Sequence, residues 1–271
     1  MPSHEQEVEE IHVPRRPTGQ PVPQDEEWFE VSVDGRRRRI GFHDYGAIFG
    51  IPGLYEQLFY DKLQCNSPQT VVGLLKAELE RTDTDPGSLV ALDLGAGNGM
   101  VGEELRGIGV RTVVGVDLLA EAAAATARDR PGVYDDYVVA DLTCLDPEER
   151  ERLRDAGSDE RGAVSQRVFN CLTSVAALGF GDIPPDALAT AYDMVEPGGW
   201  IALTIKEDFL SSEDPSGFAG LIRRMLDEKM LDPYKVKRYR HRLSTNGDEL
   251  YYVALIAAKN DGRRLSRPTA S

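Results

Sequence analysis

Long apolar runs, cysteine and histidine are all scarce in this sequence of 271 residues. No apolar run approaches the ~18 residues that a membrane-spanning helix needs, so we expect no membrane segment. The three cysteines show no Cys-x-x-Cys spacing, which predicts no zinc site and fits a reducing compartment. The first residues are rich in glutamate rather than basic and then apolar, so we expect no secretory signal and a cytoplasmic location.

Positive charge is also in short supply. The chain has 31 Lys and Arg against 46 Asp and Glu, which gives a net charge of −15 and a pI near 4.8. Such an acidic surface repels phosphate backbones and anionic lipids, so neither nucleic acid nor a membrane is an expected partner. A local basic groove and a basic protein acceptor stay open, and composition does not indicate an oligomeric state. No metal-ligating cluster is visible.

Composition and hydrophobic pattern divide the chain into four segments. Residues 1–25 are rich in Pro, Glu and Gln, and have too little apolar area to offset their ordering entropy, so we expect a disordered tail. The hydrophobic pattern of residues 26–87 predicts an N-terminal hairpin followed by a helical lid. Residues 88–260 alternate strand and helix patterns, and residues 261–271 predict a loose C-terminal tail.

The predicted N-terminal hairpin has Asp34-Gly35 at its turn, between two runs of strand character. The second run begins with four arginines, residues 36–39. We interpret them as one exposed strand, with a phosphate-binding patch as the alternative.

From residue 88 onward, short apolar runs alternate with helical patterns and end in a hairpin that turns at Asn246-Gly247. The expected strands cover residues 89–94, 111–117, 137–140, 168–173, 200–205, 235–243 and 249–258. This alternation predicts an α/β, three-layer Rossmann-like sandwich, whose mostly parallel sheet carries an antiparallel C-terminal strand.

A glycine-rich loop, Asp93-Leu94-Gly95-Ala96-Gly97-Asn98-Gly99, joins the first of these strands to a helix. Its glycines allow a tight turn and let a ligand approach the backbone, at the edge where open α/β sheets bind ligands. The loop alone is ambiguous, because residues 97–102 also fit the G-x-G-x-x-G dinucleotide pattern. A simple tight turn is the third interpretation.

Three carboxylates end three successive strands of this region. Asp93 beside the loop suits a positively charged ligand and would repel a pyrophosphate. Asp117 offers acceptors for two ribose hydroxyls, a role that NAD enzymes share. Asp141 can accept from the amino group of a base, and capping of a helix or turn is the alternative.

These stretches resemble motifs of the class I (Rossmann-like) S-adenosylmethionine-dependent methyltransferases. The four matching stretches occur in the family's order, at residues 92–99, 114–117, 140–142 and 195–200. The resemblance covers about residues 42 to 258 and implies a seven-stranded sheet, S-adenosyl-L-methionine as cofactor and S-adenosyl-L-homocysteine as product. Residues 175–184, followed by Pro197-Gly198-Gly199, are similar to the Williams–Beuren-type small methyltransferases.

The resemblance also implies which residues contact the cofactor. They are Asp93, Gly95, Ala96, Gly97, Gly99, Asp117, Leu118, Asp141, Leu142 and Ser174, with Tyr55 from a helical segment that folds over the cofactor. One departure is Asn170, which stands in the fourth strand where an Asp is common. No Asn-Pro-Pro-Tyr sequence follows it, so methylation of a base amino group is not indicated.

We therefore expect methyl transfer to oxygen, nitrogen or carbon of a small-molecule acceptor, mainly by proximity and orientation. A general base can help, and His43 and His241 are the candidates, because His4 and His12 lie in the tail. Histidines in such positions are more often structural. Two alternatives stay open: an NAD-linked oxidoreductase, and a non-catalytic protein that binds S-adenosylmethionine.

Overall fold

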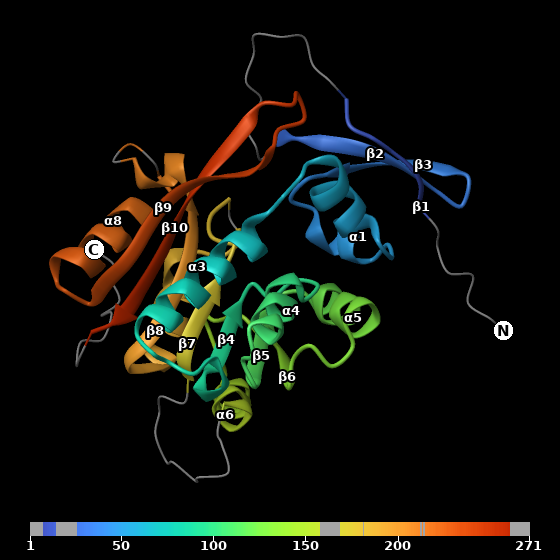
Figure 1. Ribbon diagram of the computed structural model, residues 1–271. Coiled ribbons are helices and arrows are strands. Elements are labelled where there is room, and N and C mark those ends of the chain that lie inside the picture. Colours follow the sequence, from blue (N-terminus) through green and yellow to red (C-terminus); the bar gives the residue numbers. More distant parts are fainter. Residues whose placement is uncertain are drawn as a thin grey trace.

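A computed structural model of the chain describes residues 8–14, 26–157, 169–180, 182–211, 213 and 215–260. A seven-stranded sheet with helices packed against it forms the larger part, and a three-stranded sheet with short helices forms the smaller N-terminal part (Figure 1). None of the helices in the described ranges has both the length and the apolar character that crossing a bilayer requires.

The large sheet has the strand order β6-β5-β4-β7-β8-β10-β9. Its strands are β4 (Val90–Leu94), β5 (Thr112–Asp117), β6 (Asp136–Val139), β7 (Phe169–Ser174), β8 (Val195–Lys206), β9 (Leu231–Leu243) and β10 (Glu249–Lys259). The first five pair in parallel, whereas β10 runs antiparallel to both β8 and β9. The predicted Rossmann-like α/β fold with an antiparallel C-terminal strand is confirmed.

Apolar clusters cover both faces of this sheet. The helices beside it are α3 (Ser67–Arg81), α4 (Met100–Gly107), α5 (Ala120–Asp129), α6 (Pro147–Ala156), α7 (Pro185–Met194) and α8 (Phe218–Asp227), with the short turns η3 (Pro86–Ser88) and η4 (Glu207–Leu210). Side chains of α3 and α4 share one cluster with the strands, and those of α6, α7 and α8 share the other. In α8, Phe218, Leu221, Ile222 and Met225 are buried at helical spacing and pack against the sheet, whereas Leu226 is 40% exposed.

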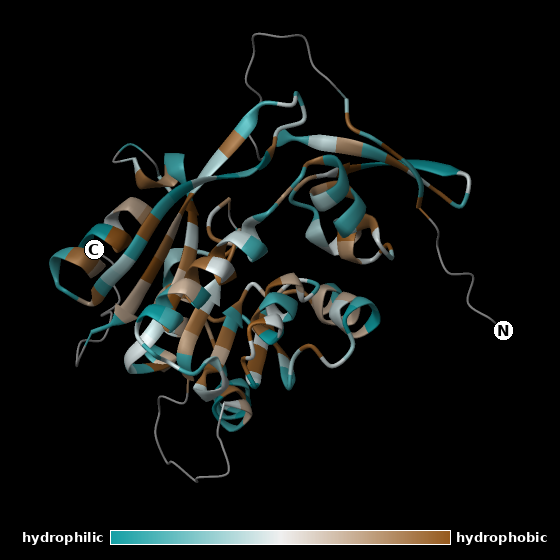
Figure 2. Cartoon of the chain, viewed as in Figure 1, coloured by the Kyte–Doolittle hydropathy of each residue, from teal (hydrophilic) through white to brown (hydrophobic). Residues whose placement is uncertain are grey.

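Hydropathy follows this arrangement (Figure 2). The central strands β4 and β5 are buried along most of their length, as expected for parallel strands covered on both faces. The edge strand β9 is exposed from residue 232 to residue 238. The protein thus keeps its apolar residues in the middle of the sheet and its charged residues at the edge.

The N-terminal module comprises β1 (Val8–His12), β2 (Trp28–Val33), β3 (Arg36–Gly41), α1 (Tyr45–Phe49), α2 (Leu54–Glu56) and the π-helical turn η2 (Gln57–Lys62). Its strands pair antiparallel in the order β1-β2-β3. The expected hairpin turn forms at Asp34-Gly35, where both residues have positive φ. The arginines of residues 36–39 are exposed, as predicted.

Residues 8–12 correct the expectation of a disordered tail. They form β1 because pairing with β2 buries Ile11, which is 5% exposed, among the apolar side chains of the module. The rest of the expected tail, residues 1–7 and 15–25, lies outside the described residues, as does the expected C-terminal tail of residues 261–271.

Candidate active site

The glycine-rich loop between β4 and α4 is fixed by the end of β5. The amides of Gly95 and Ala96 both donate to the carbonyl of Val116, at 2.9 and 3.1 Å. Gly95 has a φ of +73°, and a Cβ at this position would lie 2.6 Å from the Cβ of Ala177. Only glycine fits such a close approach at positive φ.

Asp117 connects this loop to the strand beside it. Its Oδ2 accepts from the amide of Gly97 and its Oδ1 from the amide of Leu119, both at 3.0 Å. Burial raises the pKa of the Asp117 carboxyl. Each carboxylate oxygen has two acceptor positions, so Asp117 can hold the loop and still accept from ligand hydroxyls.

Asp93 has a different place from the one that the sequence predicts. Its side chain is buried within the protein, where Oδ1 accepts from the Thr173 hydroxyl at 2.7 Å and Oδ2 from the Tyr134 hydroxyl at 2.6 Å. Burial raises the pKa of Asp93 to about 6. Asp93 is 1% exposed and is absent from the lining of the cavity described below, so it supports the base of the loop from within the fold.

The remaining residues expected at the strand ends differ in exposure. Asp141 Oδ1 accepts from the amide and the hydroxyl of Thr143, at 2.8 and 2.7 Å, and the hydroxyl bond lowers the pKa of Asp141. Asp141 therefore caps the turn that follows β6, which is the alternative role considered for it from the sequence. Leu118 is 58% exposed beside Asp117, whereas Leu142 is buried. Ser174 is fully buried, and its hydroxyl has no hydrogen-bond partner among the described residues.

A cavity of about 750 Å³, including open solvent at its mouth, lies between the loop and the N-terminal module. Seven Phe and Tyr side chains contribute to its wall: Phe42, Tyr45, Tyr55, Phe59, Tyr60, Phe180 and Tyr252. Of the predicted site residues, it brings together His43, Tyr55, Gly95, Ala96, Gly97 and His241. The others, including Gly99, Asp117 and Ser174, lie outside its lining.

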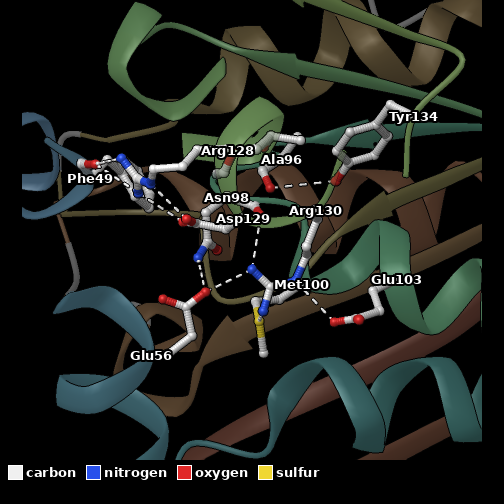
Figure 3. Close-up of polar contacts among 12 residues, drawn as sticks. Phe49, Glu56, Ala96, Asn98, Met100, Glu103, Arg128, Asp129, Arg130 and Tyr134 are labelled. Atoms are coloured by element: carbon white, nitrogen blue, oxygen red, sulfur yellow. Dashed lines mark hydrogen bonds and ion pairs between the residues drawn. The ribbon is translucent and has the colours of Figure 1, made fainter. Parts of the chain in front are cut away.

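An ionic network fastens the N-terminal module to the loop (Figure 3). Glu56 Oε1, from α2, accepts from Asn98 Nδ2 at 2.6 Å and from Arg130 Nη1 at 2.7 Å. Arg130 also pairs with Glu103 at 2.9 Å. Sequence reasoning missed this network, because its members belong to three separate segments and none carries a motif.

His43 meets a carboxylate that the sequence did not single out. Its Nδ1 lies 3.1 Å from Oδ2 of Asp182, in the connection between β7 and α7. The imidazole also packs against Phe180, with ring centres 4.6 Å apart. All three side chains line the cavity.

His241 lies deeper and is held as a structural residue. Its Nδ1 is 2.7 Å from the Ser67 hydroxyl, and its ring stacks on Tyr252 with centres 4.0 Å apart. Burial holds its pKa well below the ordinary histidine value, so the ring is neutral and a weak base near neutral pH.

The basic run of residues 235–242 has the charge pattern of a solvated edge strand. His241 and Arg242, at its end, are nevertheless buried. The N-terminal module covers this end of β9 through backbone hydrogen bonds from Asn66 to His241 and from Leu243 to Leu63. Sequence pattern does not show which part of an edge strand a distant segment covers.

The comparisons with known proteins agree with this geometry. A family model described as a methyltransferase domain matches residues 71–251. A Thermoplasma acidophilum protein of known structure is 13% identical, with a TM-score of 0.50 over 81% of this chain and 97% of its own. Magnesium protoporphyrin IX methyltransferase from Synechocystis PCC 6803, crystallised with S-adenosylmethionine, is 15% identical, with a TM-score of 0.50 over 80% and 98%. At such identities the likeness shows the fold alone. No curated protein matches the sequence.

Proposed function

The chain belongs to the methyltransferase domain family, and on that premise we propose that it transfers a methyl group from S-adenosylmethionine to a small molecule held in the aromatic cavity. The observation that carries this proposal is the cavity itself. The cofactor loop forms one wall and the N-terminal module forms the other, so a ligand inside it touches both. We also propose a cytoplasmic setting, in keeping with the free state of Cys65, Cys144 and Cys171.

The residues at the strand ends fit the cofactor. Gly95, Ala96 and Gly97 of the loop line the cavity, the buried Ser174 hydroxyl lacks a partner among the described residues, and the exposed apolar Leu118 lies beside the Asp117 carboxylate. We assign the ribose hydroxyls to Asp117, the base to the surroundings of Leu118, Asp141 and Leu142, and the methionine end to the loop and Tyr55. The family resemblance implies these contacts and also Asp93, which here supports the loop from within the fold instead.

Bound S-adenosylmethionine supplies an already activated methyl group, so the work of the protein is orientation. Aromatic walls hold an apolar acceptor and keep water away from it, and the loop fixes the donor. Fixed orientation can lower a barrier by roughly 7–11 kcal/mol in favourable cases. His43 is the candidate base at the cavity wall.

The NAD-linked alternative loses its support, because the G-x-G-x-x-G stretch lies within the region that matches the methyltransferase family. The other alternative is a non-catalytic protein that binds the cofactor, and a measurement of turnover distinguishes it from an enzyme. An enzyme releases S-adenosylhomocysteine from S-adenosylmethionine when supplied with fractions of small-molecule extracts, whereas a binding protein does not.

Isothermal titration with S-adenosylhomocysteine tests the cofactor site. The Asp117→Ala variant should bind more weakly by roughly 1–3 kcal/mol, because ligand hydroxyls lose a buried acceptor. Asp232→Ala, an exposed position on β9, is the matched control and should leave the affinity unchanged. Folded wild-type protein without measurable affinity would overturn the proposal.

A further inference from the structure

One imidazole in the cavity wall is paired with a carboxylate from another part of the fold. His43 lies between β3 and α1 of the N-terminal module, and Asp182 precedes α7 beside the large sheet. Their Nδ1 and Oδ2 atoms are 3.1 Å apart, and the side chains are 19% and 28% exposed. The pair forms only because the module sits over the carboxyl ends of the strands.

The pairing decides which ring nitrogen faces a ligand. A carboxylate only accepts hydrogen bonds, so the hydrogen of the neutral imidazole resides on Nδ1 and the lone pair on Nε2. Within the described residues, Nε2 of His43 has no hydrogen-bond partner, although the ring lines the cavity. The carboxylate also stabilises the imidazolium that forms when Nε2 takes a proton.

The rest of the wall indicates what kind of molecule would meet this nitrogen. Around His43 lie Phe180, at 4.6 Å between ring centres, and Tyr45, at 5.7 Å. Phe42, Phe59 and Tyr252 add further ring surface. Rings favour offset or edge contacts with other rings, so the space suits a flat aromatic molecule. A neutral amine attacks a methyl donor with its own lone pair, whereas a hydroxyl benefits from losing its proton as it attacks.

We propose that the acceptor is a phenol, that His43 Nε2 removes its proton, and that Asp182 is the positioning residue for His43. The inference rests on the proposed methyltransferase function. The phenol O–H bond breaks and its proton passes to Nε2, while the oxygen forms a bond to the methyl carbon. The methyl–sulfur bond breaks with its electron pair left on sulfur, which gives S-adenosylhomocysteine and an aryl methyl ether. His43 then releases the proton to solvent.

The surroundings place this pair beside the cofactor loop. Burial is the main cause of the raised pKa values of Asp117, at the end of β5, and Tyr45, on α1, and the charge of Asp182 adds to both. Asp182 and the ring of Tyr45 contact His43, and the ammonium of Lys206 lies 5.1 Å from the ring centre of Phe180, which also packs against His43. The other titratable side chains of the cavity are Tyr55, Tyr60, Cys65, His241, Arg242 and Tyr252.

A coloured phenol tests the proton transfer, whichever phenol is the natural acceptor. Protein saturated with S-adenosylhomocysteine is titrated with 4-nitrophenol, whose phenolate has its own visible absorbance, and catechol serves as a competing ligand. We expect the phenolate-to-phenol ratio of the probe to rise about tenfold on binding, which corresponds to a fall of about one unit in the pKa of the bound phenol. His43→Gln should abolish this rise. Asp182→Asn should reduce it while the probe still binds, and Asp182→Glu should restore part of it.

Controls separate this inference from the proposed function. Asp186→Asn removes an equal charge from an exposed side chain in the first turn of α7, four residues from Asp182, and should leave the phenolate ratio unchanged. All variants should keep wild-type affinity for S-adenosylhomocysteine, which shows that they fold. If the cofactor product binds but neither phenol does, the acceptor class is wrong. If His43→Gln ionises the probe as the wild type does, His43 is not the base. If S-adenosylhomocysteine does not bind, the proposed function itself fails.

Discussion

Asp93 and Asp117 end neighbouring parallel strands, yet the protein uses the two carboxylates differently. Asp93 gives both oxygens to the hydroxyls of Tyr134 and Thr173 inside the fold. Asp117 gives its oxygens to two backbone amides and is only partly buried. The first therefore supports the loop from within, and the second keeps capacity for a ligand.

Asp93 should make stability depend on pH. Burial raises its pKa to about 6 in the folded protein, against an ordinary value of 3.8. The folded state binds this proton more tightly than the unfolded state, so the carboxyl's contribution to stability is full below about pH 4 and is lost as the pH rises through about 6. Asp93→Asn removes the titration. We expect the free energy of unfolding of the wild type, relative to this variant, to fall by about 2–3 kcal/mol between about pH 4 and about pH 7.

Urea denaturation of the protein without cofactor, at a series of pH values, measures this difference. Asp136→Asn is a control of opposite sign, because the hydrogen bond from Arg152 lowers the pKa of Asp136. Its contribution is present at neutral pH and lost on acidification. A wild-type curve parallel to that of Asp93→Asn would show that Asp93 does not titrate in this range.

At the scale of elements, two attachments besides the end of β5 position the loop between β4 and α4. One is the close packing of Gly95 against Ala177 and Ile183. The other is Glu56 on α2, which holds both Asn98 of the loop and Arg130 after α5. The first comes from the sheet side and the second from the N-terminal module.

Gly95→Ala should disrupt the loop. The added Cβ would lie 2.6 Å from carbon atoms of both Ala177 and Ile183, at a φ of +73° that alanine rarely adopts. We expect thermal denaturation at a lower temperature and loss of S-adenosylhomocysteine binding in calorimetry. Gly73→Ala is the matched control: it lies exposed within α3, with no atom within 4 Å of the added Cβ. It should stabilise the protein by roughly 0.5–1 kcal/mol.

Glu56→Ala should weaken cofactor binding although Glu56 does not line the cavity. Asn98 and Arg130 lose their shared acceptor, and the loop is held less firmly. We expect the dissociation constant for S-adenosylhomocysteine to rise by a factor that corresponds to roughly 1–3 kcal/mol. Glu103→Ala removes the second carboxylate that pairs with Arg130. The Glu103 side chain is 61% exposed, so this substitution should have little effect. Equal effects of the two substitutions would contradict the attachment through α2.

Much of the element order could be predicted from sequence, because buried parallel strands are short apolar runs and the glycine loop follows the first of them. Contacts between distant segments could not. The partner of His43 lies 139 residues away, in the stretch of residues 175–184, whose family likeness does not indicate a contact with His43. The strand β1 was missed because a stretch with so few apolar residues becomes ordered only when another strand buries them. Asp141 shows the same limit, since a carboxylate at a strand end fits a ligand and a turn equally well.

Across the whole molecule, one buried ion pair joins the two ends of the described chain. Arg242 Nη2, on β9, donates to Glu27 Oε2 at 2.7 Å, and both side chains are 3% exposed. Glu27 Oε1 also accepts from the amide of Thr245. The N-terminal module is thereby fixed to the C-terminal hairpin, and the cavity between module and loop depends on that attachment.

Arg242→Met should be strongly destabilising, because it leaves the Glu27 carboxylate buried without its cation. The expected cost is about 3–5 kcal/mol in the free energy of unfolding. The double variant Glu27→Gln/Arg242→Met removes both charges and should recover part of this loss, while glutamine can still accept from Thr245. Chemical denaturation of the wild type, both single variants and the double variant measures the coupling. Strictly additive costs would mean that the pair does not act as a unit.

The place of β10 within the large sheet has a consequence for synthesis on the ribosome. This strand lies between β8 and β9 and pairs with both, so β9 has no neighbour in the sheet until residues 249–259 have been translated. Until then β8 has an open edge, of the kind that invites pairing with other chains. The ion pair between Glu27 and Arg242 also cannot form until Arg242 has been translated. The cavity is therefore incomplete in a nascent chain that lacks the C-terminal hairpin. The ability to hold ligands therefore arises only after residues 249–259 have been made, late in the translation of this domain.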